Sequence, residues 1–237
     1  MKLNTGFMAE AFLAALGGIP VTLEITLVTL LLSAPIAFFM ALGRLHKRGI
    51  GGRLIAGYVS FIRGTPVVLQ ILFLYSLLPS LLNYIMNQVL ELDFDVFGVP
   101  PIVYAFVVFS LNTTAVLSEV FRSALLTVGS GQMEAALSVG LSARQAYVRI
   151  VIPQAFTAAL PNLCNTTVSL LKSTSLAFMM TVQDIMAIAK VEAAYGYNYI
   201  EAYLDVFLIY IILCTFVQLA FRFAERRASS YKKPAAC

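Results

Sequence analysis

The stretch from 162 to 173 carries the side chains best suited to binding a polar solute. Amides, hydroxyls and one ammonium recur there every three or four residues, at Asn162, Asn165, Thr166, Ser169, Lys172 and Ser173. This spacing places them along one face of an α-helix. Amides and hydroxyls can donate and accept hydrogen bonds, so the row can contact a solute with charges of both signs. We expect a binding face here, with helix–helix hydrogen bonding as the alternative and Asn112 and Thr113 as secondary candidates.

Catalytic chemistry has little support in the sequence. The one histidine, His46, stands away from any candidate nucleophile, and neither HExxH nor GxSxG occurs. The spacing of Cys164, Cys214 and Cys237 is not typical of a metal site or a disulfide framework. The GxxxxGK[ST] phosphate loop is absent as well. We therefore expect a protein that is not an enzyme and that itself binds neither a metal nor a cofactor.

The elements that must position the polar face are membrane-spanning helices. Hydrophobic residues make up 60% of the chain and charged residues 12%, with a mean hydropathy of +0.87. Soluble domains carry about 25% charged residues, and a helix needs about 20 apolar residues to cross a bilayer. Uncharged stretches of suitable length occupy 25–43, 64–90, 96–118, 150–171 and 206–221. They predict an all-α membrane protein with five transmembrane helices.

Charges between these stretches predict the orientation of the chain. The segments after the first, third and fifth stretches are basic, and those after the second and fourth are acidic. Because Lys and Arg accumulate on the cytoplasmic side, we expect the N-terminus outside and the C-terminus in the cytoplasm. This topology explains the basic segments without nucleic-acid binding. We further expect an amphipathic helix at the membrane surface over 1–17, a transmembrane domain over 18–225 and a cytoplasmic tail over 226–237.

Two charged residues fall near the inner end of the third stretch. Glu119 and Arg122 stand three residues apart, the spacing of an ion pair on one helix. A charge within a span has an insertion cost of about 2.5–3.5 kcal/mol, so each needs a role. We expect either a helix-surface ion pair or a pair that acts in gating or between subunits.

A polar cassette, EAALSVGLSARQAYVRIVIPQ over 134–154, stands on the predicted cytoplasmic side. Ala136 and Gly140 fall one helical turn apart, where small side chains permit close approach of another backbone. Gly140 is expected to end this helix, and Ser142, followed by Gln145, to cap the next one. Pro153 marks the beginning of the fourth span. The pattern predicts a loop over 127–153 that contacts a partner, with an ordinary amphipathic connector as the alternative.

Four motifs in order resemble those of bacterial ABC importer permeases. The cassette is similar to the EAA loop of that family, through Glu134, Ala135, Ala136, Gly140 and the Ile150-x-Ile152-Pro153 ending. Three stretches resemble span signatures of the polar amino acid branch, which includes histidine, glutamine and cystine permeases: SFIRGTPVVLQILFLY over 60–75, SEVFRSAL over 118–125 and SLLKSTSLA over 169–177. The resemblance covers about 18–224. It implies the type I importer permease fold.

The resemblance also implies function and partners. It is that of a permease subunit of an ATP-driven, binding-protein-dependent amino acid importer in the bacterial cytoplasmic membrane. The residues implied to engage an ATPase dimer, which would hold ATP and Mg, are Glu134, Ala135, Ala136, Gly140, Ser142 and Pro153. The other implied partners are a second permease chain, identical or homologous, an extracytoplasmic solute-binding protein at the acidic outer segments, above all 184–205, and membrane lipid.

Two features bear on the solute and on the alternative class of transporter. Thr166 stands where relatives that carry cationic amino acids have an acid, so we expect a neutral polar or sulphur-containing amino acid such as cystine. The sequence departs from the family pattern at Ser173, where an Asp or Asn usually follows the lysine, and this leaves the role of Lys172 open. The alternative is a stand-alone secondary carrier or channel for small polar solutes. An internal inverted repeat, common in carriers, is not apparent.

Overall fold

The computed structural model describes residues 3–45 and 49–228, and its regular elements over these ranges are helices. Within them, four helices are long and apolar enough to cross a membrane, or five if one bent pair counts as a single span. The all-helical prediction is thus confirmed, with four or five candidate spans. His46, Lys47, Arg48 and the predicted tail beyond 228 lie outside the described residues.

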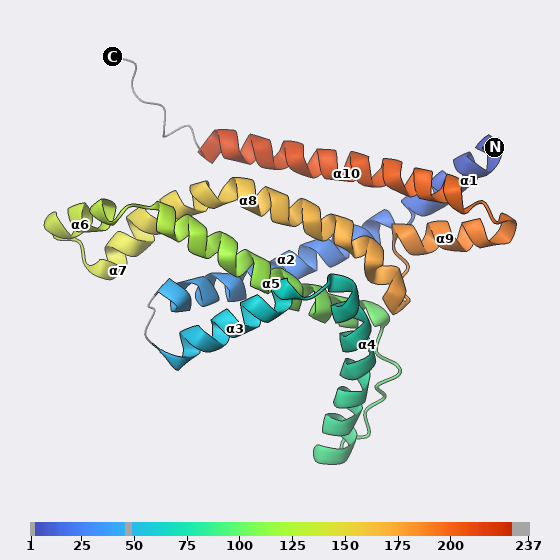
Figure 1. Ribbon diagram of the computed structural model, residues 1–237, viewed down its shortest axis with the longest axis horizontal. Helices are drawn as coiled ribbons and strands as arrows, with labels where there is room; N and C mark the ends of the chain where they lie inside the picture. Colours follow the sequence, from blue (N-terminus) through green and yellow to red (C-terminus); the bar gives the residue numbers. More distant parts are fainter. Residues whose placement is uncertain (1–2, 46–48, 229–237) are drawn as a thin grey trace.

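Four long helices form the body of the molecule. They are α2 (Ile19–Leu45), α5 (Pro101–Thr127), α8 (Ile152–Ser173) and α10 (Tyr199–Ala228). They run alongside one another in Figure 1, and α2 packs most extensively against α5. Ile25 of α2 and Phe109 of α5 are fully buried in the largest apolar cluster. This packing fixes α5 beside α8, which carries the predicted binding face.

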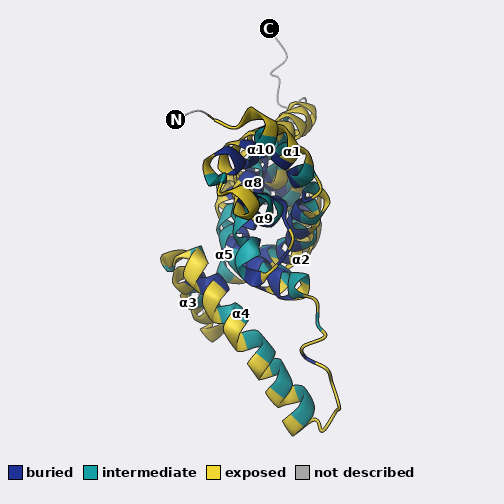
Figure 2. Cartoon of the chain, turned by 90° about the vertical axis from the view of Figure 1, so that its right-hand side faces the viewer, coloured by how far each residue is buried: buried dark blue, intermediate teal, exposed yellow. Residues whose placement is uncertain are grey.

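The predicted second span forms, and a break separates it from the helix before it. The structure has α3 (Ile50–Gly64), then α4 (Val67–Asn83), which continues into the π-helical segment η1 (Tyr84–Val89). The stretch Val67–Val89 is long and apolar enough to be one membrane span, in agreement with the predicted 64–90. Pro66 disfavours helical geometry at the preceding residue, and Thr65 is extended, with φ −114° and ψ 143°. As a result α3 packs on α2 and α5, while α4 leaves the bundle (Figures 1 and 2).

Short helices occupy the two ends of the bundle. At one end lie α6 (Ser130–Ser138), α7 (Ala143–Ala146) and the π-helical segment η2 (Tyr147–Val151), and at the other α1 (Thr5–Leu16) and α9 (Ile185–Gly196) (Figure 1). The segment η3 (Thr174–Met180) extends α8, so that one helical run from Ala143 to Met180 bends by 52° into α9. The fourth predicted span is therefore longer than the uncharged stretch 150–171.

The predicted N-terminal helix forms, and its apolar side packs on protein. Phe7, Phe12 and Leu16 of α1 contact the apolar cluster made by α9 and α10. Leu13 of the same helix is exposed. The N-terminal helix is thus anchored by the C-terminal third of the chain, and its placement at the membrane surface stays a prediction.

Gly18, in the turn between α1 and α2, allows two backbones to touch. A β-carbon there would lie 2.4 Å from the Ile185 amide nitrogen and 2.6 Å from the Asp184 carbonyl carbon. Backbone atoms cannot move aside as a flexible side chain does. We expect Gly18→Ala to destabilise the fold by at least about 1–3 kcal/mol, the usual cost of overpacking. Thermal unfolding of the purified protein in nanodiscs measures the loss.

The matched control for this substitution is Gly57→Ala. Gly57 lies inside α3, and nothing stands within 4 Å of the β-carbon that alanine would add. Alanine favours a helix interior over glycine by about 0.5–1 kcal/mol, so Gly57→Ala should leave stability unchanged or raise it. Equal melting temperatures for the Gly18→Ala and wild-type proteins would contradict the close approach.

Candidate translocation path and coupling surface

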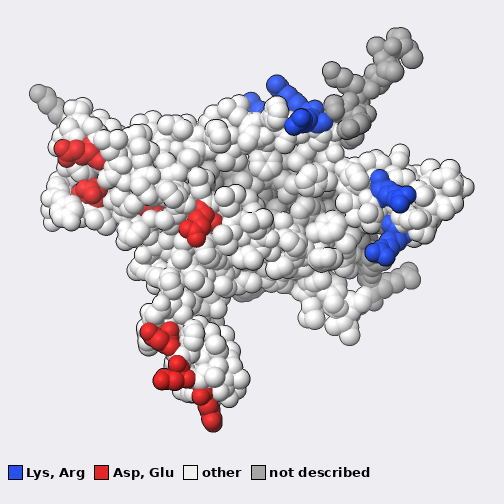
Figure 3. Space-filling view, turned by 180° about the vertical axis from the view of Figure 1, so that it is seen from behind, with Lys and Arg blue, Asp and Glu red and all other residues white. Residues whose placement is uncertain are grey.

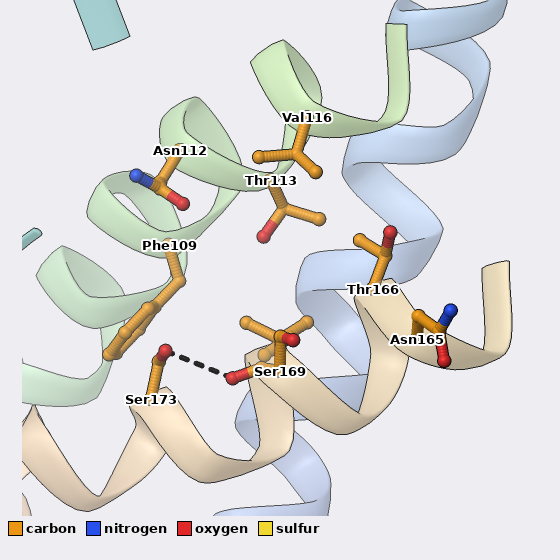
Figure 4. A pocket seen from close by; sticks show the side chains of 9 residues that line it. Phe109, Asn112, Thr113, Val116, Asn165, Thr166, Ser169 and Ser173 are labelled. Atoms are coloured by element: carbon orange, nitrogen blue, oxygen red, sulfur yellow. Dashed lines mark hydrogen bonds between the residues drawn. The ribbon is translucent and has the colours of Figure 1, made fainter. Parts of the chain in front are cut away.

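A cavity of about 180 Å³ opens between α5 and α8. Most of the predicted polar residues meet there. Its lining is Phe109, Asn112, Thr113 and Val116 from α5 with Asn165, Thr166, Ser169, Leu170 and Ser173 from α8 (Figure 4). The secondary candidates on α5 thus face the main candidates on α8 across one space. The cavity is large enough for a few water molecules or part of a small solute.

Two hydroxyl groups on α8 that line the cavity, those of Thr166 and Ser173, donate hydrogen bonds within the helix. Thr166 Oγ1 donates to the Asn162 carbonyl oxygen at 2.8 Å, and Ser173 Oγ donates to the Ser169 carbonyl oxygen at 2.9 Å. A hydroxyl that donates in this way retains lone pairs that accept. Both oxygens therefore remain available to the cavity as hydrogen-bond acceptors.

On the side away from the cavity, Asn112 contacts Gln70, a residue that the sequence did not identify as a candidate. Its Nδ2 donates to Gln70 Oε1 of α4 at 2.9 Å. In Figure 4 the amide nitrogen of Asn112 points away from the cavity and the oxygen toward it. Gln70 is buried, with 7% of its surface exposed. A polar side chain within the uncharged stretch 64–90 was the signal that could have identified it.

Two members of the predicted face lie elsewhere. Asn162 is exposed, and it does not line the cavity. Lys172 lines a separate cavity of about 430 Å³ against α10, with Tyr210, Cys214 and Gln218 among its neighbours. The row on α8 therefore serves two surfaces. One faces α5, and the other faces α10.

The predicted pair of Glu119 and Arg122 forms, and it has a third member. Arg122 Nη2 lies 2.8 Å from Glu119 Oε2, while Arg44, at the end of α2, pairs with Glu119 Oε1. The three side chains are between 17% and 33% exposed. Glu119 therefore joins the C-terminal parts of α2 and α5 within one chain. Arg44 had been counted only as part of a basic loop.

Removing the charge of Glu119 should loosen this junction. Glu119→Gln leaves two guanidinium groups facing each other without a carboxylate. Breaking a fully buried pair costs about 3–5 kcal/mol, and partial exposure lowers this, so we expect a loss of about 1–2 kcal/mol. Thermal unfolding of the purified protein at low and high salt measures it, with the exposed Glu10→Gln as control. An unchanged melting temperature would show that the cluster contributes no stability.

The cassette folds as its capping signals predicted. Gly140 adopts φ +85°, and the Leu141 amide donates back to the Ala136 carbonyl oxygen at 3.1 Å, which ends α6. The Ser142 side chain accepts from the Gln145 amide while the Gln145 side chain accepts from the Ser142 amide, the reciprocal cap of α7. Both expectations about these helix ends are confirmed.

The cassette presents a different surface from the expected one. Ala136 is only 2% exposed, because α6 packs on α7 and η2. On α6 and the residue after it, the large exposed apolar side chains are Leu137 and Val139, the latter 77% exposed. Ala136 therefore seats α6 on its own chain rather than admitting a partner's backbone. Its neighbours Glu134, Ala135 and Gly140 are exposed, as a contact surface requires.

An apolar cluster joins α6 to the bundle. Met133 of α6 and Tyr147 of η2 pack with Leu125 of α5, Ala155 of α8 and Ala41 of α2. Through η2, α6 also continues into the helix that lines the cavity. The cassette therefore forms one packed unit with α2, α5 and α8, and the last two of these line the cavity.

The acids of the segment 184–205 are mostly buried. Asp184 caps the first turn of α9 by accepting from the Ala187 amide at 2.9 Å, and Glu201 accepts from the Asn4 amide at 3.1 Å. Asp205 is buried as well, while Glu192 is half-buried. The carboxylates of Asp184 and Glu201 thus support the local fold. The most exposed large apolar side chains in this segment are Tyr195 and Tyr197, at the end of α9.

Charges separate along the molecule. On the face shown in Figure 3, Lys and Arg gather at the end that holds α6 and α7 and at the C-terminal end of α10. Asp and Glu gather at the opposite end and at the tip of α4. The two ends of the bundle therefore carry opposite charge, in the pattern that a membrane protein shows across a bilayer.

Comparisons with known proteins agree over most of the chain. The family described as "binding-protein-dependent transport system inner membrane component" matches residues 33–230. The L-cystine transport system permease protein TcyL of Bacillus subtilis (strain 168) is 34% identical over 209 residues, which cover 88% of this chain and 84% of TcyL. The probable amino-acid ABC transporter permease protein PatM of Vibrio harveyi is 33% identical over 222 residues, covering 92% and 95%.

A solved structure has the same fold. The chain from a crystal structure of an amino acid ABC transporter with histidines has a TM-score of 0.77 and 24% identity, with 96% of this chain and 100% of that chain covered. With 24% identity, this comparison shows the shared arrangement of helices alone.

Proposed function

This chain belongs to the binding-protein-dependent transport system inner membrane component family, and on that premise we propose that the cavity between α5 and α8 is part of the path of an amino acid across the membrane. The chain is the permease subunit of a binding-protein-dependent ABC amino acid importer and a multi-pass inner-membrane protein of bacteria. It is non-catalytic, and ATP is bound by the ATPase subunit of the complex. Membership of this family removes the stand-alone carrier or channel as an alternative.

The observation that carries the proposal is the composition of the cavity. Two neighbouring spans contribute amide and hydroxyl groups to it, and polar groups inside a span must face protein or water. A zwitterionic amino acid needs acceptors for its ammonium and donors for its carboxylate, and amide and hydroxyl side chains include both. The path therefore contains Asn112, Thr113 and the cavity-lining residues of α8. Asn162 and Lys172 lie outside this path.

The coupling surface is α6 with the turn that follows it. Glu134, Ala135 and Gly140 contact the ATPase together with Leu137 and Val139, while Ala136, Ser142 and Pro153 give the cassette its shape. Closure of an ATPase dimer around ATP moves α6 as a rigid body. The packed cluster around Met133 and Tyr147 passes this motion to α2, α5 and α8. Nucleotide binding thereby shifts the population between two packings of the spans.

The basic end of the molecule faces the cytoplasm in this proposal. The separation of charge in Figure 3 supports the N-terminus outside and the C-terminus inside. The solute-binding protein then docks at the end that carries α9, where Tyr195 and Tyr197 project. Most acidic side chains of 184–205 are buried, so this docking surface consists of exposed aromatic side chains and not of carboxylates. Aromatic residues are enriched in such interfaces.

A second permease chain completes the path. The helical segment Val67–Val89 stands away from its own bundle, and within it only Gln70 and Ile71 are buried (Figure 2). Most of its other side chains are apolar. We place the partner permease against this segment, where it closes the open side of the cavity around an axis normal to the membrane. Lipid covers the remainder.

The proposed solute is a neutral amino acid, with L-cystine as the first candidate. The name of TcyL supports cystine, and the cavity lining contains no charged side chain. A carboxylate for a cationic side chain is therefore missing from this wall of the path.

Reconstitution tests the function directly. The permease, its ATPase and its binding protein are placed in proteoliposomes with ATP inside, and uptake of radiolabelled L-cystine and of a labelled mixture of the protein amino acids is measured. We expect uptake that needs ATP, the ATPase and the binding protein together. Uptake that persists without the ATPase, or no uptake of any amino acid, would reject the proposal.

A further inference from the structure

Gln70 connects the cavity to the break between α3 and α4. Its Nε2 donates to the Ile62 carbonyl oxygen at 2.8 Å and to Thr65 Oγ1 at 2.8 Å. Its Oε1 accepts from Asn112 Nδ2 at 2.9 Å. One buried side chain thus joins the end of α3, the beginning of α4 and the middle of α5, although it does not line the cavity itself.

The break determines which way the Gln70 amide points. In a continuous helix the Ile62 carbonyl would accept from the amide four residues later, but that residue is Pro66, which has no N–H. A carbonyl oxygen can only accept, so the NH₂ group of Gln70 must face it. The Ile62 carbonyl also accepts from Thr65 Oγ1 at 3.3 Å, and Gln70 Nε2 lies 3.1 Å from a second acceptor, the Thr65 carbonyl oxygen. Turning the Gln70 amide round would place its oxygen against both carbonyl oxygens, where no hydrogen bond can form. The oxygen of Gln70 is therefore directed toward α5.

The orientation of Gln70 determines that of Asn112. An amide oxygen at Gln70 can be paired only by a donor, so Asn112 turns its NH₂ group toward Gln70. The Asn112 oxygen then faces the cavity, as Figure 4 shows. The hydroxyls of Thr166 and Ser173 also donate to carbonyl oxygens within α8, so their oxygens can accept hydrogen bonds from the cavity. Three groups on two spans thus offer acceptors to the same space.

We propose that Gln70 is a positioning residue that holds the Asn112 oxygen in place to accept a hydrogen bond from the ammonium group of the transported amino acid. This inference rests on the proposed function of the cavity. It assigns a chemical role to the proline in the sequence RGTPVVLQ: Pro66 frees the carbonyl that orients Gln70, and Gln70 in turn orients Asn112.

Three substitutions separate this role from simple support of the break. Gln70→Met removes both sets of hydrogen bonds at similar side-chain volume. Gln70→Glu, in its neutral protonated form, donates its O–H to the Ile62 carbonyl and keeps an oxygen that accepts from Asn112. Thr65→Val removes the three hydrogen bonds that the Thr65 hydroxyl makes at the break, with the carbonyl oxygens of Phe61 and Ile62 and with Gln70 Nε2, and leaves the contact between Gln70 and Asn112 untouched. In proteoliposomes holding the full complex, we expect uptake of radiolabelled L-cystine to fall about tenfold for Gln70→Met, a hydrogen bond's worth, and by less than about threefold for the other two.

A double-mutant cycle tests whether Gln70 acts through Asn112. Asn112→Ala alone should lower uptake about as much as Gln70→Met. If Gln70 works only by orienting Asn112, adding Gln70→Met to Asn112→Ala should change uptake by less than about twofold. The proposal would be overturned if the double variant lost uptake by the product of the two single-variant fold reductions. Equal losses of uptake in Thr65→Val and Gln70→Met would overturn it as well, because both results point to the break alone.

A spectroscopic measurement keeps the inference independent of the solute. In the complex prepared with isotope-labelled asparagine, the side-chain amide signal of Asn112 is the one lost in Asn112→Ala. This signal should shift in Gln70→Met and stay in place in Thr65→Val. An unmoved signal in Gln70→Met would reject the positioning role even if transport is normal. Should the wild-type complex import no amino acid, the proposed function fails, and the position of this signal still decides whether Gln70 orients Asn112.

Discussion

Val139→Asp should abolish ATP-driven uptake while leaving the permease folded. Val139 is 77% exposed at the end of α6, beside the exposed Leu137 and the left-handed Gly140. In the proposed complex this side chain enters a groove of the ATPase, where an aspartate would be buried without a partner charge. Central apolar contacts of this kind are worth at least about 2 kcal/mol, so ATPase binding should weaken at least about thirtyfold.

Copurification of the ATPase and uptake in proteoliposomes measure this effect together. The matched control is Ser130→Asp, which adds the same charge to an exposed residue in the first turn of α6. An acid there is favoured by the helix dipole, and we expect wild-type binding and uptake. Retention of the ATPase by the Val139→Asp protein, with normal uptake, would mean that α6 is not the coupling surface.

The helix ends of the cassette could be predicted because their signals are local. A glycine with positive φ and a serine followed three residues later by glutamine need only their own neighbours to form a cap. The side of α6 that faces a partner could not be predicted in this way. Ala136 is buried because α7 and η2 pack against α6, and this contact cannot be predicted from the sequence of α6 itself.

The extent of the second span could be predicted, and the helix before it could not. The uncharged stretch 64–90 agrees with the candidate span Val67–Val89. Pro66 ends α3, and the direction that α4 then takes depends on packing beyond this segment. The carboxylates of α10 show the same limit. Glu201 is buried because Asn4, near the other end of the chain, donates to it.

The polar face of α8 was predicted in composition and only partly in direction. Periodicity identifies side chains that share a helix face to within about a third of a turn, but the neighbouring helices determine which of them meet. Here α5 covers the side that holds Thr166 and Ser173, and α10 covers the side that holds Lys172. A cavity between α5 and α8 therefore excludes two of the six residues in the row.

This division of the row leads to the second prediction, in which Ser169→Phe blocks transport. Ser169 lines the cavity from α8, and a phenyl ring there would fill much of a space of about 180 Å³. An amino acid cannot pass an occupied site, so uptake should fall at least about hundredfold, equivalent to about 2.7 kcal/mol. ATPase binding should be unchanged, because Ser169 lies several turns from α6 along the helical run that begins at Ala143.

Asn162→Phe is the matched comparison on the same helix. Asn162 is exposed, belongs to the same periodic row and lies outside the cavity lining. If the cavity is the path, the added ring at 162 should reduce uptake by less than about threefold, since exposed substitutions away from a binding site change free energies by about 0.5 kcal/mol. If instead the whole face of α8 lines the path, both variants should block uptake equally. The ratio of the two uptake rates therefore distinguishes a path shaped by the contact between α5 and α8 from one determined by the periodicity of α8 alone.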